Sequence, residues 1–231
     1  MIKKLILDID DTLFDFQKSE RCALVETLGS LGIADDDGVV ALYHKINREQ
    51  WEALERGEIE RRELLTRRFD ILFSELSVSA SSAEAQSRYE KNLGRQVYFI
   101  DGAMELLDAL RGKYELYVAS NGTAAVQDPR IERSEISPYF NGIFISERVG
   151  YNKPDIRFFN ACLSAMGVQD KSEVMIFGDS LTSDILGGIN AGIRSCWFNP
   201  SGKKNDTPHK PDYEVKHLLD FPKLLENVNK G

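Results

Sequence analysis

The chain has 231 residues, of which 42% are hydrophobic and 29% are charged, and its formal net charge is -8 at pH 7. This composition is typical of a soluble protein that is long enough for one large domain, or for a core domain with a smaller insertion. The negative charge argues against a nucleic acid or an anionic membrane as partner, because both require a basic face. An acidic protein that handles phosphate must rely on a bound cation and a few positive groups.

Three cysteines, Cys22, Cys162 and Cys196, lie far apart and form no CxxC pair. Such an odd, scattered set is typical neither of a disulfide framework nor of a zinc site, and it fits a reducing compartment. The amino terminus begins like a signal peptide but reaches Asp8 too soon, and no apolar run approaches the ~20 residues that span a bilayer. We therefore expect a cytoplasmic protein, and no pattern in the chain indicates its oligomeric state.

In residues 5–13 a run of apolar and β-branched residues ends abruptly in three carboxylates, those of Asp8, Asp10 and Asp11. The run predicts a buried strand of a parallel sheet, and ligands of such sheets bind outside the carboxyl ends of the strands. Like charges this close repel one another unless a cation or protons neutralise them. A metal-dependent phosphoryl site is the simplest explanation; the alternative is a turn in which Asp10, Asp11 and Thr12 cap the next helix.

After these acids, apolar residues recur at helical spacing for a long stretch. Residues 16–31 and 39–54 each predict a helix, and the stripe within residues 65–76 predicts a third. Residues 77–87, rich in Ser and Ala, predict a loop and the start of a helix that ends near Leu93. Such stripes are more often packing surfaces than cofactor sites, so we expect a compact helical insertion.

Strands and helices alternate along the rest of the chain. The expected strands are residues 115–119, 142–145, 174–177 and 194–198, and the expected helices lie at residues 104–110, 157–166, 185–189 and 217–228. We expect Asp101 to cap the first of these helices. Repeated strand–helix units build a doubly wound parallel sheet, so the predicted fold class is α/β.

Polar residues follow several of the predicted strands. Besides the first acidic cluster, these are Ser120 with Asn121, the loop at Lys153, and Asp179 with Asp184. Each group alone has a simpler explanation, namely a turn, an exposed loop lysine, or a helix cap with a solvated helix acid. Together, however, they lie at one edge of one predicted sheet, where a ligand is expected.

The four motifs of the haloacid dehalogenase-like (HAD) hydrolases are matched, in order, by Asp8-x-Asp10-x-Thr12, Ser120, Lys153-Pro154 and Gly178-Asp179-x4-Asp184. The resemblance covers the whole chain. It implies a Rossmann-like core of residues 1–14 and 96–231, with residues 15–95 inserted as an α-helical cap. The order of the motifs also separates the chain from response-regulator receivers, which use a similar set of acid, hydroxyl and lysine.

The resemblance implies that Asp8 is the nucleophile that forms an aspartyl-phosphate, and that Asp10 protonates the leaving alkoxide and later activates water. Ser120 and Lys153 complete the catalytic set. The residues implied to bind the substrate phosphate are Thr12, Ser120, Asn121 and Lys153. No catalytic role follows for Asp11, because many relatives have glycine at that position.

The resemblance also implies Mg²⁺ as cofactor. Its ligands would be Asp8, the backbone carbonyl of Asp10, and the carboxylate of Asp179, since Mg²⁺ prefers hard oxygen ligands. Asp184 is expected to complete the metal site through water or by orienting the other ligands.

Within the superfamily, the carboxylate of Asp10 favours phosphoryl chemistry, because a halide leaves without a proton and dehalogenases need no acid there. Mutases use the same pair of acids, so the motifs do not distinguish a mutase from a phosphatase. Residues 146–155, 178–192 and 196–200 resemble the pyrimidine 5'-nucleotidases, which implies a small phosphorylated metabolite as substrate, a (deoxy)pyrimidine nucleoside monophosphate.

Two alternatives to a nucleotidase stay open: a phosphatase for another metabolite, such as a sugar phosphate or phosphoglycolate, and a non-catalytic protein that keeps the fold. The intact set of acids, hydroxyl and lysine disfavours the second. Phe14, Phe16 and Trp51 are candidates for stacking on a nucleotide base, although each also fits a core position.

Overall fold

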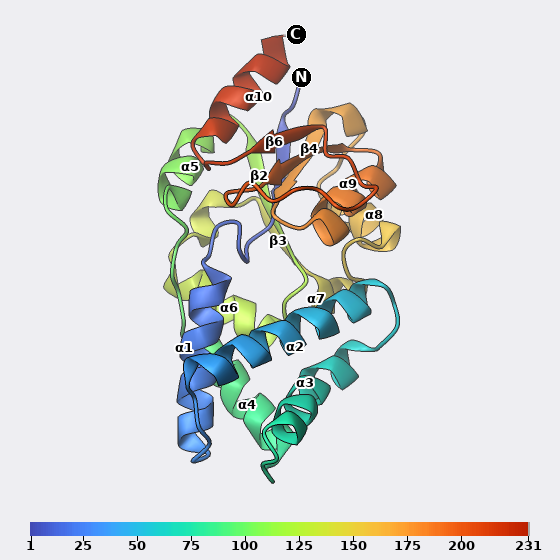
Figure 1. Ribbon diagram of the computed structural model, residues 1–231. Coiled ribbons are helices and arrows are strands. Elements are labelled where there is room, and N and C mark those ends of the chain that lie inside the picture. The colour runs from blue at the N-terminus through green and yellow to red at the C-terminus, as the bar shows by residue number, and fades with distance from the viewer. Residues whose placement is uncertain (231) are drawn as a thin grey trace. The chain divides into compact units, whose positions relative to one another are not determined.

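The computed structural model describes residues 1–230, and six strands form one sheet in the order β3-β2-β1-β4-β5-β6 (Figure 1). The strands are β1 (Lys4–Leu7), β2 (Glu115–Ser120), β3 (Gly142–Ile145), β4 (Val174–Gly178), β5 (Arg194–Phe198) and β6 (Tyr213–Val215). Every neighbouring pair runs parallel. This confirms the predicted α/β fold with a doubly wound parallel sheet.

Both faces of the sheet are covered, which explains why its strands are continuous apolar runs. On one face Ile6 packs with Phe158 and Phe159 of helix α8 (Ile156–Ala165). On the other face the ring of Phe177 stacks on Phe221, with ring centroids 4.0 Å apart. Figure 1 shows α8 and α9 on one side of the strands and α5 and α10 on the other.

Helices and turns of the sheet-containing unit complete this arrangement. They are α5 (Ala103–Leu110), η1 (Ser137–Tyr139), α7 (Ser146–Val149), η2 (Lys171–Glu173), η3 (Leu181–Ile185), α9 (Leu186–Ala191) and α10 (Asp220–Lys230). The element η3 is a π-helix, a form that is rare and often found at functional sites.

The chain divides into two compact units, of which the first, called here the core unit, holds the sheet and comprises residues 1–15, 99–124 and from 134 onward. The second, the helical unit, comprises residues 16–98 and 125–133. Its helices are α1 (Phe16–Ser30), α2 (Asp37–Glu55), α3 (Arg61–Glu75), α4 (Ser82–Leu93) and α6 (Ala124–Arg133).

The helical unit has an apolar core of its own. The buried rings of Tyr43, Phe69 and Tyr89 lie against one another with centroids 5.2 to 5.6 Å apart. The side chain of Val126, from α6, belongs to the same cluster of buried side chains. Because α6 follows β2 in the chain, its place in this cluster means that two separate stretches of sequence build the helical unit.

Two local expectations were wrong. The cap of α5 is Gly102, which makes no side-chain bond to the helix, so Asp101 does not cap it. Gly102 has a φ of 84°, a left-handed conformation that glycine adopts without steric cost. Phe14 is fully buried and its ring packs against that of Phe99 at 5.3 Å, so it offers no stacking surface to a ligand.

All three cysteines are free thiols, and Cys162 and Cys196 are buried. Burial raises the pKa of the Cys162 thiol to about 12, which keeps it protonated and unreactive at neutral pH. Within residues 1–230, no helix combines the length and the apolar character needed to cross a membrane.

The packing of α9 on α8 depends on a glycine. A Cβ at Gly187 would lie 2.3 Å from the ring of Phe159, which is fully buried and would have to shift. We expect Gly187→Ala to lower the free energy of unfolding by about 1–3 kcal/mol, measured by chemical denaturation. The matched control is Gly29→Ala in α1, where the nearest atom is 3.8 Å away and the change should be neutral or stabilising. An unchanged stability of Gly187→Ala would contradict this account of the packing.

Candidate active site

The loop after β1 folds back on its first residue. Asp8 continues the strand, since its N–H donates to the carbonyl of Phe177 at 2.9 Å, and its side chain is buried. Asp11 then takes a left-handed conformation with φ of 57°, which aspartate tolerates better than most residues. This turn brings the Thr12 hydroxyl to Oδ2 of Asp8 at 3.1 Å.

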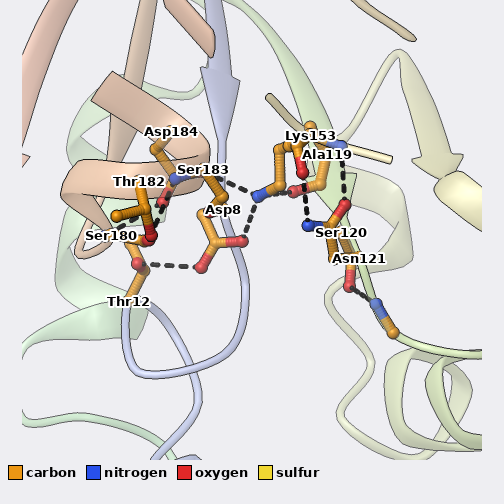
Figure 2. Close-up of polar contacts among 11 residues, drawn as sticks. Asp8, Thr12, Ala119, Ser120, Asn121, Lys153, Ser180, Thr182, Ser183 and Asp184 are labelled. Carbon is orange, nitrogen blue, oxygen red and sulfur yellow. Dashed lines mark hydrogen bonds and ion pairs between the residues drawn. The ribbon is translucent and has the colours of Figure 1, made fainter. Parts of the chain in front are cut away.

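Lys153 lies beside Asp8 and is 1% exposed. Its ammonium group donates to Oδ1 of Asp8 and to Oδ1 of Asp184, both at 2.6 Å, and to the carbonyl of Ala119 at 2.8 Å (Figure 2). These acceptors match the three N–H groups of the ammonium. The predicted alternative of an exposed loop lysine is therefore wrong.

Asp184 is fully buried and reaches the site because of two local features. The π-helix η3 carries it back toward β4, where its Oδ2 accepts from the N–H of Ser180 at 3.1 Å. A Cβ on Gly178 would lie 2.3 Å from Oδ2 of Asp184, so only glycine fits at the end of that strand. Ser180 caps η3, since its Oγ accepts from the N–H of Ser183. Asp184 is thus a buried ion-pair partner and not a solvated helix acid.

Asp179 is half-buried next to these groups, and the indole N–H of Trp197 holds its backbone carbonyl at 2.7 Å. Carboxylate oxygens of Asp8, Asp179 and Asp184 all lie within 4.8 Å of one another. Three carboxylates face one buried ammonium, which leaves an excess of negative charge when all are ionised. A hard divalent cation would neutralise that excess, and the donor set consists of the oxygen ligands that Mg²⁺ prefers.

The pKa values of this cluster reflect its burial and crowding. Burial, partly opposed by Lys153 and reinforced by Asp184, raises the pKa of Asp8 to about 7, and Asp10 adds a further like charge. Burial and then the charges of Asp8 and Asp184 hold the pKa of Asp179 well above its usual value. Burial opposes the charge of Lys153, but the two carboxylates outweigh it and raise its pKa.

The end of β2 is connected to the backbone of Lys153 by the side chain of Asn121. The Oγ of Ser120, a buried residue, accepts from the N–H of Gly122 at 3.0 Å. The side-chain amide of Asn121 donates to the carbonyl of Lys153 at 2.9 Å and accepts from the N–H of Lys153 at 2.8 Å. Asn121 was expected to bind phosphate, whereas the structure places its side chain against the backbone of the lysine.

The structure thus joins Asp8, Thr12, Lys153 and Asp184 in one network of hydrogen bonds, and it places a carboxylate oxygen of Asp179 within 4.8 Å of those of Asp8 and Asp184. Asp10 lies half-buried, two residues from Asp8, and its charge acts on the pKa of that residue. Sequence reasoning missed the supporting groups, namely the Ala119 carbonyl, Ser180 and Trp197. The position of a backbone carbonyl such as that of Ala119 cannot be read from the sequence. The Gly178-Asp179-Ser180 triplet, by contrast, indicates a turn that places polar groups at the end of an apolar strand.

Known proteins resemble this chain over almost its full length. The family model for haloacid dehalogenase-like hydrolases matches residues 2–192. The pyrimidine 5'-nucleotidase PynA of Streptococcus pneumoniae is 38% identical over 230 residues, which cover 99% of this chain and 96% of that protein. The pyrimidine 5'-nucleotidase YjjG of Escherichia coli is 30% identical over 221 residues, which cover 96% of each protein.

A solved structure agrees with these matches. The HAD-hydrolase YfnB of Bacillus subtilis, crystallised with magnesium and described as revealing interdomain movement, aligns with a TM-score of 0.92 at 34% identity. The alignment covers 97% of this chain and 98% of that one. In agreement with its four motifs, the chain belongs to the haloacid dehalogenase-like hydrolases.

Proposed function

We propose that this hydrolase removes phosphate from small phosphomonoesters through an aspartyl-phosphate on Asp8, with Mg²⁺ as cofactor. The observation that carries the proposal is the buried contact of one ammonium with Asp8 and Asp184 at the end of the central strands. Phosphate monoesters resist nucleophiles because their oxygens are negative, so a site that attacks them must neutralise charge and fix geometry. The free cysteines fit the reducing cytoplasm as its location.

In this proposal Asp8 attacks phosphorus through Oδ2 while its other oxygen stays bound to Lys153. Thr12 fixes the orientation of the carboxylate, since its hydroxyl donates to Oδ2 in the resting site. Lys153 neutralises the charge that builds up on the transferring group, as a point charge next to Asp8. Ser120, at the adjacent strand end, donates its hydroxyl to a phosphate oxygen.

Asp10 supplies the proton of the leaving alkoxide and later takes a proton from the water that opens the aspartyl-phosphate. The half-buried position of its carboxylate in the turn before Phe14 fits access to a ligand outside the strand end. A leaving halide would need no such acid, and this supports phosphate ester hydrolysis over dehalogenation.

The residues that would hold Mg²⁺ are Asp8 and Asp179 through their carboxylates, and Asp10 through its backbone carbonyl. When bound there, the cation would neutralise phosphate oxygens and the charge that develops on them. Asp184 already bonds to Lys153 and to the N–H of Ser180. We therefore propose that it orients these two groups and adds negative charge to the cation site.

For the substrate we propose pyrimidine nucleoside 5'-monophosphates, with preference for the deoxy form. This is supported by two relatives named pyrimidine 5'-nucleotidases, at 38% and 30% identity over nearly the full length. A phosphate site alone holds every monoester similarly, so discrimination requires contacts to the rest of the molecule. We assign those contacts to residues 15–95, acting as a cap. Phe16 and Trp51 stay candidates for stacking on the base.

The cap would close over the substrate and exclude water from the aspartyl-phosphate. The magnesium-bound structure of YfnB, described as revealing interdomain movement, supports motion of this kind in a close relative. The chain passes between the two compact units at residues 15–16, 98–99, 124–125 and 133–134. We expect the hinges of such motion near residues 14–16 and 95–102.

We expect turnover to require Mg²⁺ and to stop with a chelator, and Asp179→Ala to raise the Mg²⁺ concentration for half-maximal rate by at least tenfold. The reason is that Asp179 supplies one of the few carboxylates near the cation position. The measurement is a Mg²⁺ titration of aryl phosphate hydrolysis. Asp206→Asn, at an exposed position in the loop between β5 and β6, is the control, and it should titrate like the wild type. Full activity after chelation would contradict the metal assignment.

The substrate proposal is tested by kcat/KM for dUMP and dTMP against AMP, a hexose phosphate and phosphoglycolate under one set of conditions. We expect the pyrimidine nucleotides to lead by at least tenfold, equivalent to ~1.4 kcal/mol of transition-state binding. If a sugar phosphate or phosphoglycolate leads by that factor, the nucleotidase assignment is wrong and the general phosphatase proposal survives.

A further inference from the structure

Asn121 and Lys153 are joined by a pair of hydrogen bonds that runs in both directions. The Nδ2 of Asn121 donates to the Lys153 carbonyl at 2.9 Å, and its Oδ1 accepts from the Lys153 N–H at 2.8 Å. Both backbone polar groups of the lysine are therefore held by one side chain (Figure 2). Because the amide of Asn121 is planar, the pair fixes the orientation of the lysine backbone as well as its distance.

The position of this backbone decides where the ammonium lies. The Lys153 side chain is buried along its length, and its Nζ meets Asp8, Asp184 and the Ala119 carbonyl at 2.6 to 2.8 Å. A shift of the backbone by a fraction of an ångström would lengthen at least one of these contacts. Errors of about 1 Å in a catalytic group can cost on the order of 10²-fold in rate.

The loop that carries Lys153 also makes hydrogen bonds that do not hold the lysine backbone. The next carbonyl, that of Pro154, accepts from the exposed side chain of Asn190 at 3.0 Å, and the N–H of Asp155 donates to the Asn152 carbonyl at 2.8 Å. Neither bond involves the backbone of Lys153 itself. Asn121 ties the backbone of Lys153 to the end of β2, whereas the ammonium of the same lysine bonds to the carbonyl of Ala119 in that strand.

We propose that Asn121 is a positioning residue for Lys153, and that it acts on the reaction through the lysine and not as a direct phosphate ligand. This inference rests on the proposed phosphatase function. It gives the two polar residues at the end of β2 different tasks: Ser120 faces the transferring phosphate, and Asn121 holds Lys153, whose ammonium faces that phosphate. The chemistry is unchanged, but the placement of its positive charge depends on a neutral amide.

The first test compares Asn121→Ala with Asn190→Ala. Both remove an asparagine that donates to a carbonyl of the same loop, at 2.9 and 3.0 Å, but only Asn121 holds Lys153. We expect kcat/KM for an aryl phosphate to fall on the order of 10- to 100-fold for Asn121→Ala and less than about threefold for Asn190→Ala. Asn121→Asp, which keeps the shape and loses the donor, should also fall by more than tenfold. Equal effects of the two alanine variants would overturn the proposal.

The decisive test is a double-mutant cycle with Lys153→Met. If Asn121 acts through the ammonium, Asn121→Ala should cost less than about twofold once that ammonium is absent. If Asn121 contacts the phosphate itself, the same fold-loss should appear with and without Lys153, and the proposal is then wrong. Where turnover is too slow to measure, calorimetry provides the same comparison. The affinity for inorganic phosphate in the presence of Mg²⁺ is measured for the wild type, the two single variants and the double variant.

The outcomes separate this inference from the proposed function. A wild-type protein that hydrolyses no phosphomonoester would refute the proposed function. A wild-type phosphatase in which the Asn121 and Lys153 effects are independent would refute only the positioning role. Thermal melting of each variant checks that a loss of rate does not come from unfolding.

Discussion

The site depends on a single buried cation, the ammonium of Lys153. Burying a charged amine costs several kcal/mol unless its partners compensate, and here two carboxylates at 2.6 Å and one carbonyl at 2.8 Å do so. Removing one partner of such a group is typically far more destabilising than the net value of the contact, about 3–5 kcal/mol. Asp8, the proposed nucleophile, is therefore held in place together with Asp184 and the end of β2 by one interaction.

The position of that interaction follows from the order of the strands. β1 lies between β2 and β4, with Leu7 in register with Val118 on one side and with Phe177 on the other. The residues that follow on β1, β2 and β4 are thus Asp8, Ala119 and Gly178. The polar groups of the site begin at this level of the sheet. A slip of one residue in this register would turn the acids toward the opposite face of the sheet. The missing side chain of Gly178 leaves the space that Asp184 fills.

Much of this arrangement could be predicted from the chain alone. The alternation of apolar runs and amphipathic stripes predicts the α/β fold, because strands buried on both faces and helices buried on one differ in their periodicity. The acids, hydroxyl and lysine that end or follow the strands predict a common site, because parallel strands bring their carboxyl ends to one edge. The residue types also indicate phosphate chemistry, since they supply a nucleophile, a proton donor and compensating positive charge.

Other features depended on tertiary contacts that leave no local pattern. The three-residue strand β6 is too short to show a period, and the place of α6 with the helical unit depends on packing partners far away in the sequence. The cap of α5 is a backbone conformation at Gly102, and the burial of Phe14 reflects its contact with Phe99. Asn121 fits a phosphate loop equally well in sequence, and only the geometry shows that its amide meets the Lys153 backbone.

The central claim is that Asp8 becomes covalently phosphorylated, and the most direct test is chemical trapping of that intermediate. The enzyme would be mixed with substrate and Mg²⁺, quenched rapidly and reduced with borohydride, and the modified peptide identified by mass spectrometry. The account predicts conversion of Asp8, dependent on both substrate and Mg²⁺ and absent from Asp8→Asn, which should also lose turnover because an amide cannot attack phosphorus. Modification at another residue, or sustained turnover by Asp8→Asn, would contradict it.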